Sequence, residues 1–160
     1  MKKQLMALAA AGVLLATPVG AHHAGERARA GDIVVSHAWT EEVGAMAHAV
    51  EVYVTIENLG TDADRLVGAS TVFTQPAVFQ ATVIAQDGTV MVREVPAVEI
   101  AGGQSVTFQP GGLRIVLNDV QRPLQAGGHF DMTLTFEGAG SVGIEVEIEP
   151  RDDSAEPPAA

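Results

Sequence analysis

The sequence predicts an all-β domain folded as an antiparallel β-sandwich, and three observations carry that prediction. Short segments in which apolar and polar residues alternate recur along the chain, and turns that contain Gly or Pro separate them. After residue 21, no segment keeps a helical period of apolar residues over three turns. The charged residues of the clearest segments fall on one face, so each sheet is expected to bury one face and hydrate the other.

Four strands are expected in the first half of the chain. The first covers residues 33–39, and a loop with two glutamates follows it. The second, residues 50–57, is the clearest, because β-branched apolar residues at the even positions alternate with residues that carry polar groups at the odd positions. A turn at 58–62 leads to the third strand at 65–70, and Pro76 precedes the fourth at 78–85.

The strands expected in the second half of the chain follow one another at shorter intervals. Asp87-Gly88 is a strong hairpin signal and predicts that a strand at 90–95 pairs with 78–85. Short strands are expected at 98–100 and 105–108, and a longer one at 113–120 follows the turn Pro110-Gly111-Gly112. The last two strands, 130–136 and 144–149, alternate clearly, with three glutamates on the outer face of the final one.

The first 21 residues have the layout of a secretory signal peptide. Lys2 and Lys3 give a basic start, residues 5–16 carry no charge, and small residues end the segment at Ala21. The apolar run is too short to span a bilayer, and the chain has no cysteine to which a lipid could be attached. We therefore expect an exported, periplasmic protein without a membrane anchor.

Four regions follow from these patterns. Residues 1–21 are the signal peptide, 22–30 a polar leader, 31–149 the β-sandwich domain, and 150–160 an acidic, Pro-rich tail that is expected to be disordered. Removal of the signal takes both lysines, so the nine basic residues fall to seven against 20 acidic ones, a net charge of −13. This charge argues against nucleic acid and anionic membrane surfaces as partners.

The sequence does not predict an enzyme. No serine lies in a Gly-x-Ser-x-Gly setting, no histidine is visibly paired with a serine, and the Gly-Gly pairs at 102–103 and 111–112 are turns without a following helix. The absence of cysteine also removes thiolate metal sites and cysteine nucleophiles.

Several segments, in their order and spacing, resemble the periplasmic copper chaperones called PCu(A)C. These segments are residues 30–39, residues 63–70, the Asp87-Gly88 hairpin, 110–113, and 122–124 leading to Gly127. The resemblance covers residues 31–149 and implies a cupredoxin-like, Greek-key β-sandwich. It also implies copper as the bound metal, and maturation of the copper site of cytochrome c oxidase as the role. A partner would then be another copper-handling or oxidase-assembly protein.

The copper ligands of that family are replaced in this chain. The family motif is a His, a Met eleven residues later, and a His-x-Met pair 22 residues after that Met. When the two turns are aligned, these ligands fall on Ala81, Val92, Arg114 and Val116. None of these side chains binds copper, and Arg114 places a permanent positive charge where the cation would lie. We therefore expect no copper at this position.

Other histidines and methionines are candidate ligands. His22 and His23 would form the mature N-terminus, where a free amine and imidazoles can chelate copper, or they are simply part of a polar leader. Met46 and His48 share a face at the start of the second strand and form a weaker candidate. His37 is expected to be a hydrogen-bonded packing residue, His129 a turn residue and Met132 a core residue.

Two hypotheses follow. The first is an exported copper-handling protein that has lost the usual ligands of the hairpin. The second is a non-metal-binding β-sandwich that acts through protein contacts in the periplasm.

Overall fold

The computed structural model describes residues 27–45, 47–74 and 76–151. These residues form strands and turns and contain no helix. The strands are β1 (Ala28–Ala30), β2 (Ile33–Glu41), β3 (Ala49–Asn58), β4 (Asp64–Ser70), β5 (Val78–Ile84), β6 (Val90–Val95), β7 (Val98–Ile100), β8 (Ser105–Thr107), β9 (Leu113–Asn118), β10 (His129–Phe136) and β11 (Gly140–Glu149). The predicted all-β class is therefore confirmed, and no helix long and apolar enough to cross a membrane occurs in the described ranges.

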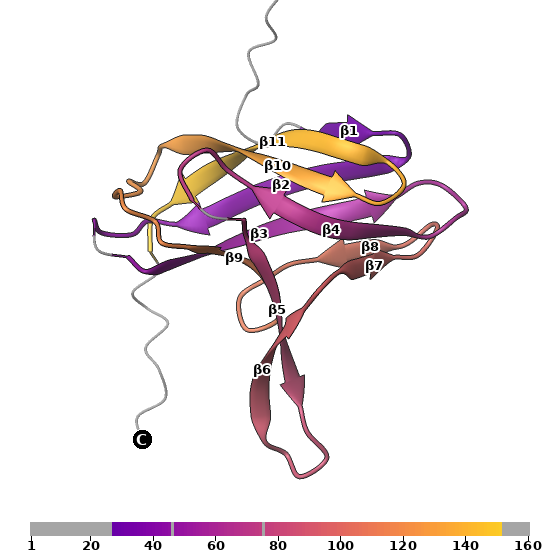
Figure 1. The fold of residues 1–160 in the computed structure, drawn as a ribbon, viewed down its shortest axis with the longest axis horizontal. Helices are drawn as coiled ribbons and strands as arrows, with labels where there is room; N and C mark the ends of the chain where they lie inside the picture. Colours follow the sequence, from indigo (N-terminus) through magenta and orange to yellow (C-terminus); the bar gives the residue numbers. More distant parts are fainter. Residues whose placement is uncertain (1–26, 46, 75, 152–160) are drawn as a thin grey trace, which may run out of the picture.

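The strands form one sheet that bends into a nearly closed sandwich. Its order is β6-β5-β9-β3-β2-β11-β10-β4-β7, while β1 pairs with β2 and β8 pairs with β3. Figure 1 shows β1, β2, β10 and β11 on one side of the body and β7 and β8 on the other. The β5–β6 hairpin extends away from this body (Figure 1).

One pairing differs from the antiparallel arrangement that the sequence predicts. β11 runs parallel to β2, with Glu147 opposite Trp39 and Glu149 opposite Glu41. The other strand pairs are antiparallel, so the sheet is mixed and the Greek-key description is approximate. Local alternation cannot reveal this pairing, because it fixes which face of a strand is buried and not which distant strand lies beside it.

The core follows the period of two residues in the strands. The even positions of β3 are buried: Val50, Val52, Val54 and Ile56 are each at most 2% exposed. β10 and β11 contribute their inward side chains in the same way, including Met132, which is 1% exposed and confirms its expected core position. Burial of these side chains is the main stabilising contribution to the fold, since the chain has no disulfide.

The sheet begins earlier in the chain than expected. Ala28–Ala30 form β1 and pair with Ile33–Val35 across a turn at Gly31, within the segment predicted to be a polar leader. Gly31 has a φ of 57°, a left-handed conformation that glycine adopts without strain. At the other end, Arg151 lies against the domain, with Nε 3.6 Å from Glu41 Oε2. The predicted signal peptide and residues 152–160 of the predicted tail lie outside the described residues.

A β-bulge interrupts β2 at His37. Ser36 pairs with Thr55 and Trp39 with Tyr53, so three steps along β2 face two steps along β3, and His37 has a φ of 55°. Its side chain is exposed, so the expectation that His37 is a packing residue is wrong. Sequence alternation missed the bulge because a non-glycine residue rarely adopts a positive φ.

Asp64 ties the start of β4 to the turn between β10 and β11. Its two carboxylate oxygens accept hydrogen bonds from the backbone N–H groups of Gly138 and Ala139, each 2.8 Å long, and a third comes from Arg65 N at 2.7 Å. Burial alone would raise the pKa of Asp64, but these three donors outweigh it and hold that pKa below its ordinary value.

Candidate functional site

The four positions predicted to match the family's copper ligands lie on β5, β6 and β9. In the register of these strands, Gln80 pairs with Arg114 and Thr82 pairs with Val92. Because side chains alternate along a strand, Val92, Arg114 and Val116 share one face with Gln80 and Thr82. Ala81 pairs with Leu113 and Arg93 and lies on the opposite face. The structure therefore brings three of the four positions together and leaves Ala81 apart.

Arg114 occupies the centre of this face. It is 8% exposed, and its side chain reaches both neighbouring strands. Nη1 donates to Thr82 Oγ1 at 3.2 Å and Nη2 donates to Gln80 Oε1 at 3.4 Å. Nε lies 3.0 Å from Glu51 Oε1 on β3, an ion pair that is not aligned as a hydrogen bond. The guanidinium thus joins the base of the hairpin to β3.

Glu51 extends this network to two aromatic side chains. The Tyr53 hydroxyl donates to Glu51 Oε2 at 2.5 Å, and the Tyr53 ring lies 4.6 Å from the Trp39 ring, centroid to centroid. Burial, followed by the hydrogen bond to Glu51 and its negative charge, raises the pKa of Tyr53 well above its ordinary value. Tyr53 therefore stays a neutral donor, and Glu51 is held between a phenol and a guanidinium.

These residues do not fit copper. Cu(I) favours thioether and imidazole ligands, and the four matched positions offer two valines, an alanine and a guanidinium that is only a donor. The face adjoins a hollow of about 390 Å³ that is lined in part by Glu41, Glu51 and Asn118. Within the described ranges, no group of three His, Cys, Asp or Glu side chains is placed to hold a metal ion.

Of the remaining candidate ligands, the structure describes only His48. His22, His23 and Met46 lie outside the described residues. His48 is exposed in a bend just before β3. His129 begins β10 instead of forming a turn, and its Nε2 lies 3.8 Å from Glu145 Oε2.

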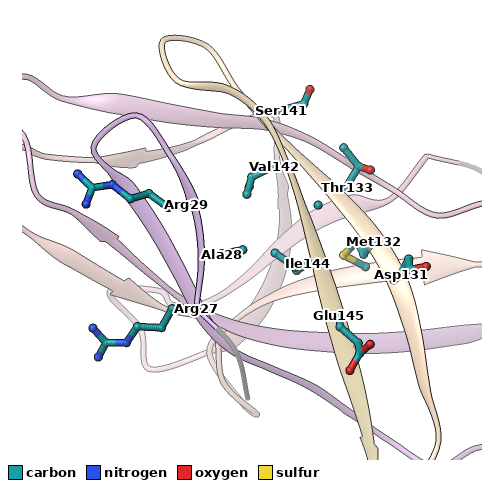
Figure 2. A pocket seen from close by; sticks show the side chains of 11 residues that line it. Arg27, Ala28, Arg29, Asp131, Met132, Thr133, Ser141, Val142, Ile144 and Glu145 are labelled. Atoms are coloured by element: carbon teal, nitrogen blue, oxygen red, sulfur yellow. The ribbon is translucent and has the colours of Figure 1, made fainter. Parts of the chain in front are cut away.

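Another hollow lies between β1 and the β10–β11 pair. It measures about 540 Å³, and Met132 and Ile144 are among its lining residues. Figure 2 shows the side chains of Arg27 and Arg29 extending away from the other labelled residues. Arg29 donates to Gly31 O at 2.7 Å and so contacts its own turn. This arrangement does not gather side chains of one chemical kind.

The partners of Arg114 were not predicted from the sequence, although a signal for them exists. An arginine within the otherwise apolar run 113–117 is buried only if acceptors satisfy it. The alternation of β3 places Glu51 on the outer face, where such an acceptor is available. Which outer-face glutamate is used depends on the pairing of β3 with β9, which alternation does not specify.

Comparison with known proteins shows the family of this chain. The family described as "Putative lipoprotein LpqE-like" matches residues 33–148, which run from the start of β2 to Ile148 in β11. The chain belongs to the LpqE-like family. A curated relative of this LpqE-like protein is the "Putative lipoprotein Lxx21020" of Leifsonia xyli subsp. xyli, 25% identical over 120 residues, which are 75% of this chain and 71% of the relative.

Solved structures confirm the PCu(A)C resemblance of the LpqE-like protein. A copper-bound PCuAC domain from PmoF2 is 25% identical, with a TM-score of 0.67 over 79% of this chain and 99% of that domain. An apo PCuAC domain from PmoF1 is 27% identical, with a TM-score of 0.69 over 79% of this chain and all of that domain. Apo-DR1885 from Deinococcus radiodurans, 21% identical with a TM-score of 0.59, covers 92% of this chain and 97% of its own and shows the shared fold.

Proposed function

We propose that this LpqE-like protein is an exported copper-handling protein whose ligands lie outside the hairpin. The observation that carries the proposal is the similarity to a copper-bound PCuAC domain over almost the whole length of that domain. Its place of action is the periplasm, in keeping with the signal-like residues 1–21 and with the lipoprotein family match. Its partner is another copper-handling or oxidase-assembly protein. It acts as a carrier and not as an enzyme.

The ligands proposed for copper are those of the mature N-terminus. Cleavage after Ala21 frees the amine of His22 beside two imidazoles, a donor set that suits copper. Met46 and His48 form the second candidate set. The position of β1 also supports the N-terminal set. Arg27 directly precedes this strand of the sandwich, and His23 is only four residues before Arg27 in the chain.

A titration of the processed protein tests this proposal. The protein that begins at His22 is titrated with Cu(I) against a chromophoric competitor and with Cu(II) by visible absorbance. The variant His22→Ala/His23→Ala is expected to lose the tight site, while His48→Ala keeps it. If copper binding of the parent is no tighter than that of the buffer, the proposal fails. If the double variant binds as the parent does, the ligand assignment is wrong.

A positive control comes from the family's own ligand set. The control variant carries Ala81→His, Val92→Met, Arg114→His and Val116→Met. The register predicts that the last three substitutions supply most of any gain in Cu(I) affinity, since they share one face and Ala81 does not. A folded variant with all four substitutions and no gain would show that the alignment of the hairpin is wrong.

The second hypothesis is an interaction module that binds no metal. The buried contact between Arg114 and Glu51 is the observation in its favour, because it fills the face that the family uses for copper. The similarity to copper-bound and apo PCuAC domains does not favour it. The same titration decides between the two hypotheses, since only the first requires a tight site in the parent protein.

A further inference from the structure

His129 and Glu145 form a pair of candidate metal ligands on the outer face of the β10–β11 hairpin. Nε2 of His129 lies 3.8 Å from Oε2 of Glu145, which is too far for a hydrogen bond. Two ligand atoms that are each about 2.0–2.2 Å from one metal ion lie at most about 4 Å apart. The two side chains therefore stand at a separation that one metal ion can bridge.

The charge of Glu145 is poorly compensated by the described part of the chain. Its side chain is only 15% exposed, and among the described residues its one salt-bridge contact is the long one to His129. Asp131 lies directly opposite Glu145 in the register of β10 and β11, and like charges in such a pair destabilise a sheet. Arg27 and Arg29 line the same hollow, but their side chains extend away from Glu145 (Figure 2). A largely buried carboxylate in this setting is stabilised by a bound cation.

The N-terminal histidines are close enough along the chain to reach this pair. Arg27, the first described residue, lines the same hollow as Glu145. Cα atoms of β1 and β11 approach within 8 Å, and β10 lies about 5 Å beyond β11. His23 precedes Arg27 by four residues, which extend over at most roughly 14 Å. With the length of the two imidazole side chains added, this reach covers the distance from β1 to His129.

The combined set of ligands suits Cu(II) better than Cu(I). The proposed mature N-terminus supplies the amine of His22 and two imidazoles, and the hairpin adds the imidazole of His129 and the carboxylate of Glu145. Nitrogen and oxygen ligands suit Cu(II), whereas Cu(I) favours soft sulfur. Met132 of β10 is 1% exposed and belongs to the core, so its sulfur does not lie on the outer face with this pair.

We propose that His129 and Glu145 bind copper together with the histidines of the mature N-terminus, and that this site takes the metal as Cu(II). The inference rests on the proposed function, because it assigns two further ligands to the same copper ion. It also assigns the N-terminal residues a position when copper is bound, which is the outer face of the β10–β11 hairpin.

Competitive Cu(II) titration of the mature protein, with electron paramagnetic resonance at one equivalent of copper, tests the proposal. His129→Gln and Glu145→Gln should each weaken Cu(II) binding at least about tenfold, since even a residue that only orients a metal ligand costs about 10–100-fold in affinity when it is replaced. The spectrum of His129→Gln should also lose the coupling of one nitrogen. The matched controls are His48→Gln and Glu99→Gln, exposed residues of the same types elsewhere in the sandwich, and they leave the affinity unchanged.

Stability without copper separates a ligand from a residue that merely supports the fold. Copper-free Glu145→Gln should be at least as stable to urea as the parent, because it removes the like charge opposite Asp131. A lower free energy of unfolding for this variant would show that the protein itself satisfies the carboxylate, and Glu145 would then not be a ligand.

The variants also distinguish this inference from the proposed function. If the parent binds Cu(II) tightly and His22→Ala/His23→Ala abolishes that binding, while His129→Gln and Glu145→Gln bind as the parent does, the inference is wrong and the proposed function stands. If the parent binds no copper, the proposed function fails and the inference fails with it. Tighter binding of Cu(I) than of Cu(II) by the parent would overturn the assigned oxidation state.

Discussion

The contact between Arg114 and Glu51 makes a quantitative prediction about stability. Glu51→Gln keeps the size of the side chain and an acceptor for Tyr53, but it removes the negative charge beside Arg114. The guanidinium is then buried with only the neutral acceptors Gln80 and Thr82. Arg114→Met instead removes the buried charge and leaves Glu51, which can be hydrated because its side chain is 44% exposed.

The magnitude follows from the unequal burial of the two side chains. Breaking a fully buried ion pair costs about 3–5 kcal/mol, and an exposed pair contributes about 0–1 kcal/mol. With Arg114 10% exposed at its side chain and Glu51 44% exposed, we expect a coupling free energy between these limits, about 1–2 kcal/mol. Glu51→Gln and Arg114→Met should each destabilise the protein by about 2 kcal/mol, and the double variant by little more than Arg114→Met.

Urea unfolding followed by tryptophan fluorescence measures these values. The chain has one tryptophan, Trp39, and its ring lies 4.6 Å from the Tyr53 ring beside the network. The four proteins of the double-mutant cycle are compared at one pH and one ionic strength. A coupling free energy below about 0.5 kcal/mol, as found for exposed surface pairs, would refute the conclusion that Arg114 joins the hairpin to β3.

Three further predictions concern single residues. Tyr53 is the only tyrosine and its pKa is raised, so absorbance near 295 nm should show no phenolate in the folded protein at pH 10. Stability should fall as pH rises above about 10, where the unfolded chain ionises; phenolate in the folded protein near pH 10 would contradict this. The depressed pKa of Asp64 stabilises the fold above about pH 4 and this contribution is lost as pH falls through the folded-state value. Asp64→Asn should therefore be less stable than the parent at pH 7, and the difference should shrink as pH falls below about 4; equal stability at pH 7 would contradict the role of its carboxylate. His37→Gly should raise the free energy of unfolding by about 0.5–1 kcal/mol by relieving the positive φ, and a loss of stability in thermal melts would show that the histidine side chain contributes contacts of its own.

The sequence predicts most strands because their burial follows local alternation. β3 is expected at 50–57 and observed at Ala49–Asn58, and β6 is observed where it is expected. β1 was missed because its three residues show no alternation and become a strand only through pairing with β2. The parallel contact between β2 and β11 and the bulge at His37 likewise depend on tertiary pairing, which a local pattern does not encode.

For the candidate site, too, the sequence predicts some features, while others depend on how the strands pair. The spacing of the turns predicts that Arg114 lies at a ligand position of the family, and this prediction needs only the sequence. Its contacts with Glu51, Gln80 and Thr82 require the register of three strands. The sequence equally suggests that Ala81 belongs with the other three positions, whereas the pairing of β5 with β9 places it on the other face. Spacing along the chain thus predicts which residue lies at each ligand position better than it predicts the face of the sheet on which that residue lies.

The parallel contact of β2 with β11 also determines when the protein can fold. Trp39 and Glu147 lie side by side in the sheet although more than a hundred residues separate them along the chain. Closing so long a loop is entropically costly, and pairings this distant slow folding to about milliseconds to seconds. The sandwich cannot close until its final strand has been synthesised. A nascent chain therefore lacks the closed sandwich until β11 has emerged from the ribosome, and a chain without its closed sandwich is in the condition in which a polypeptide can be threaded across a membrane.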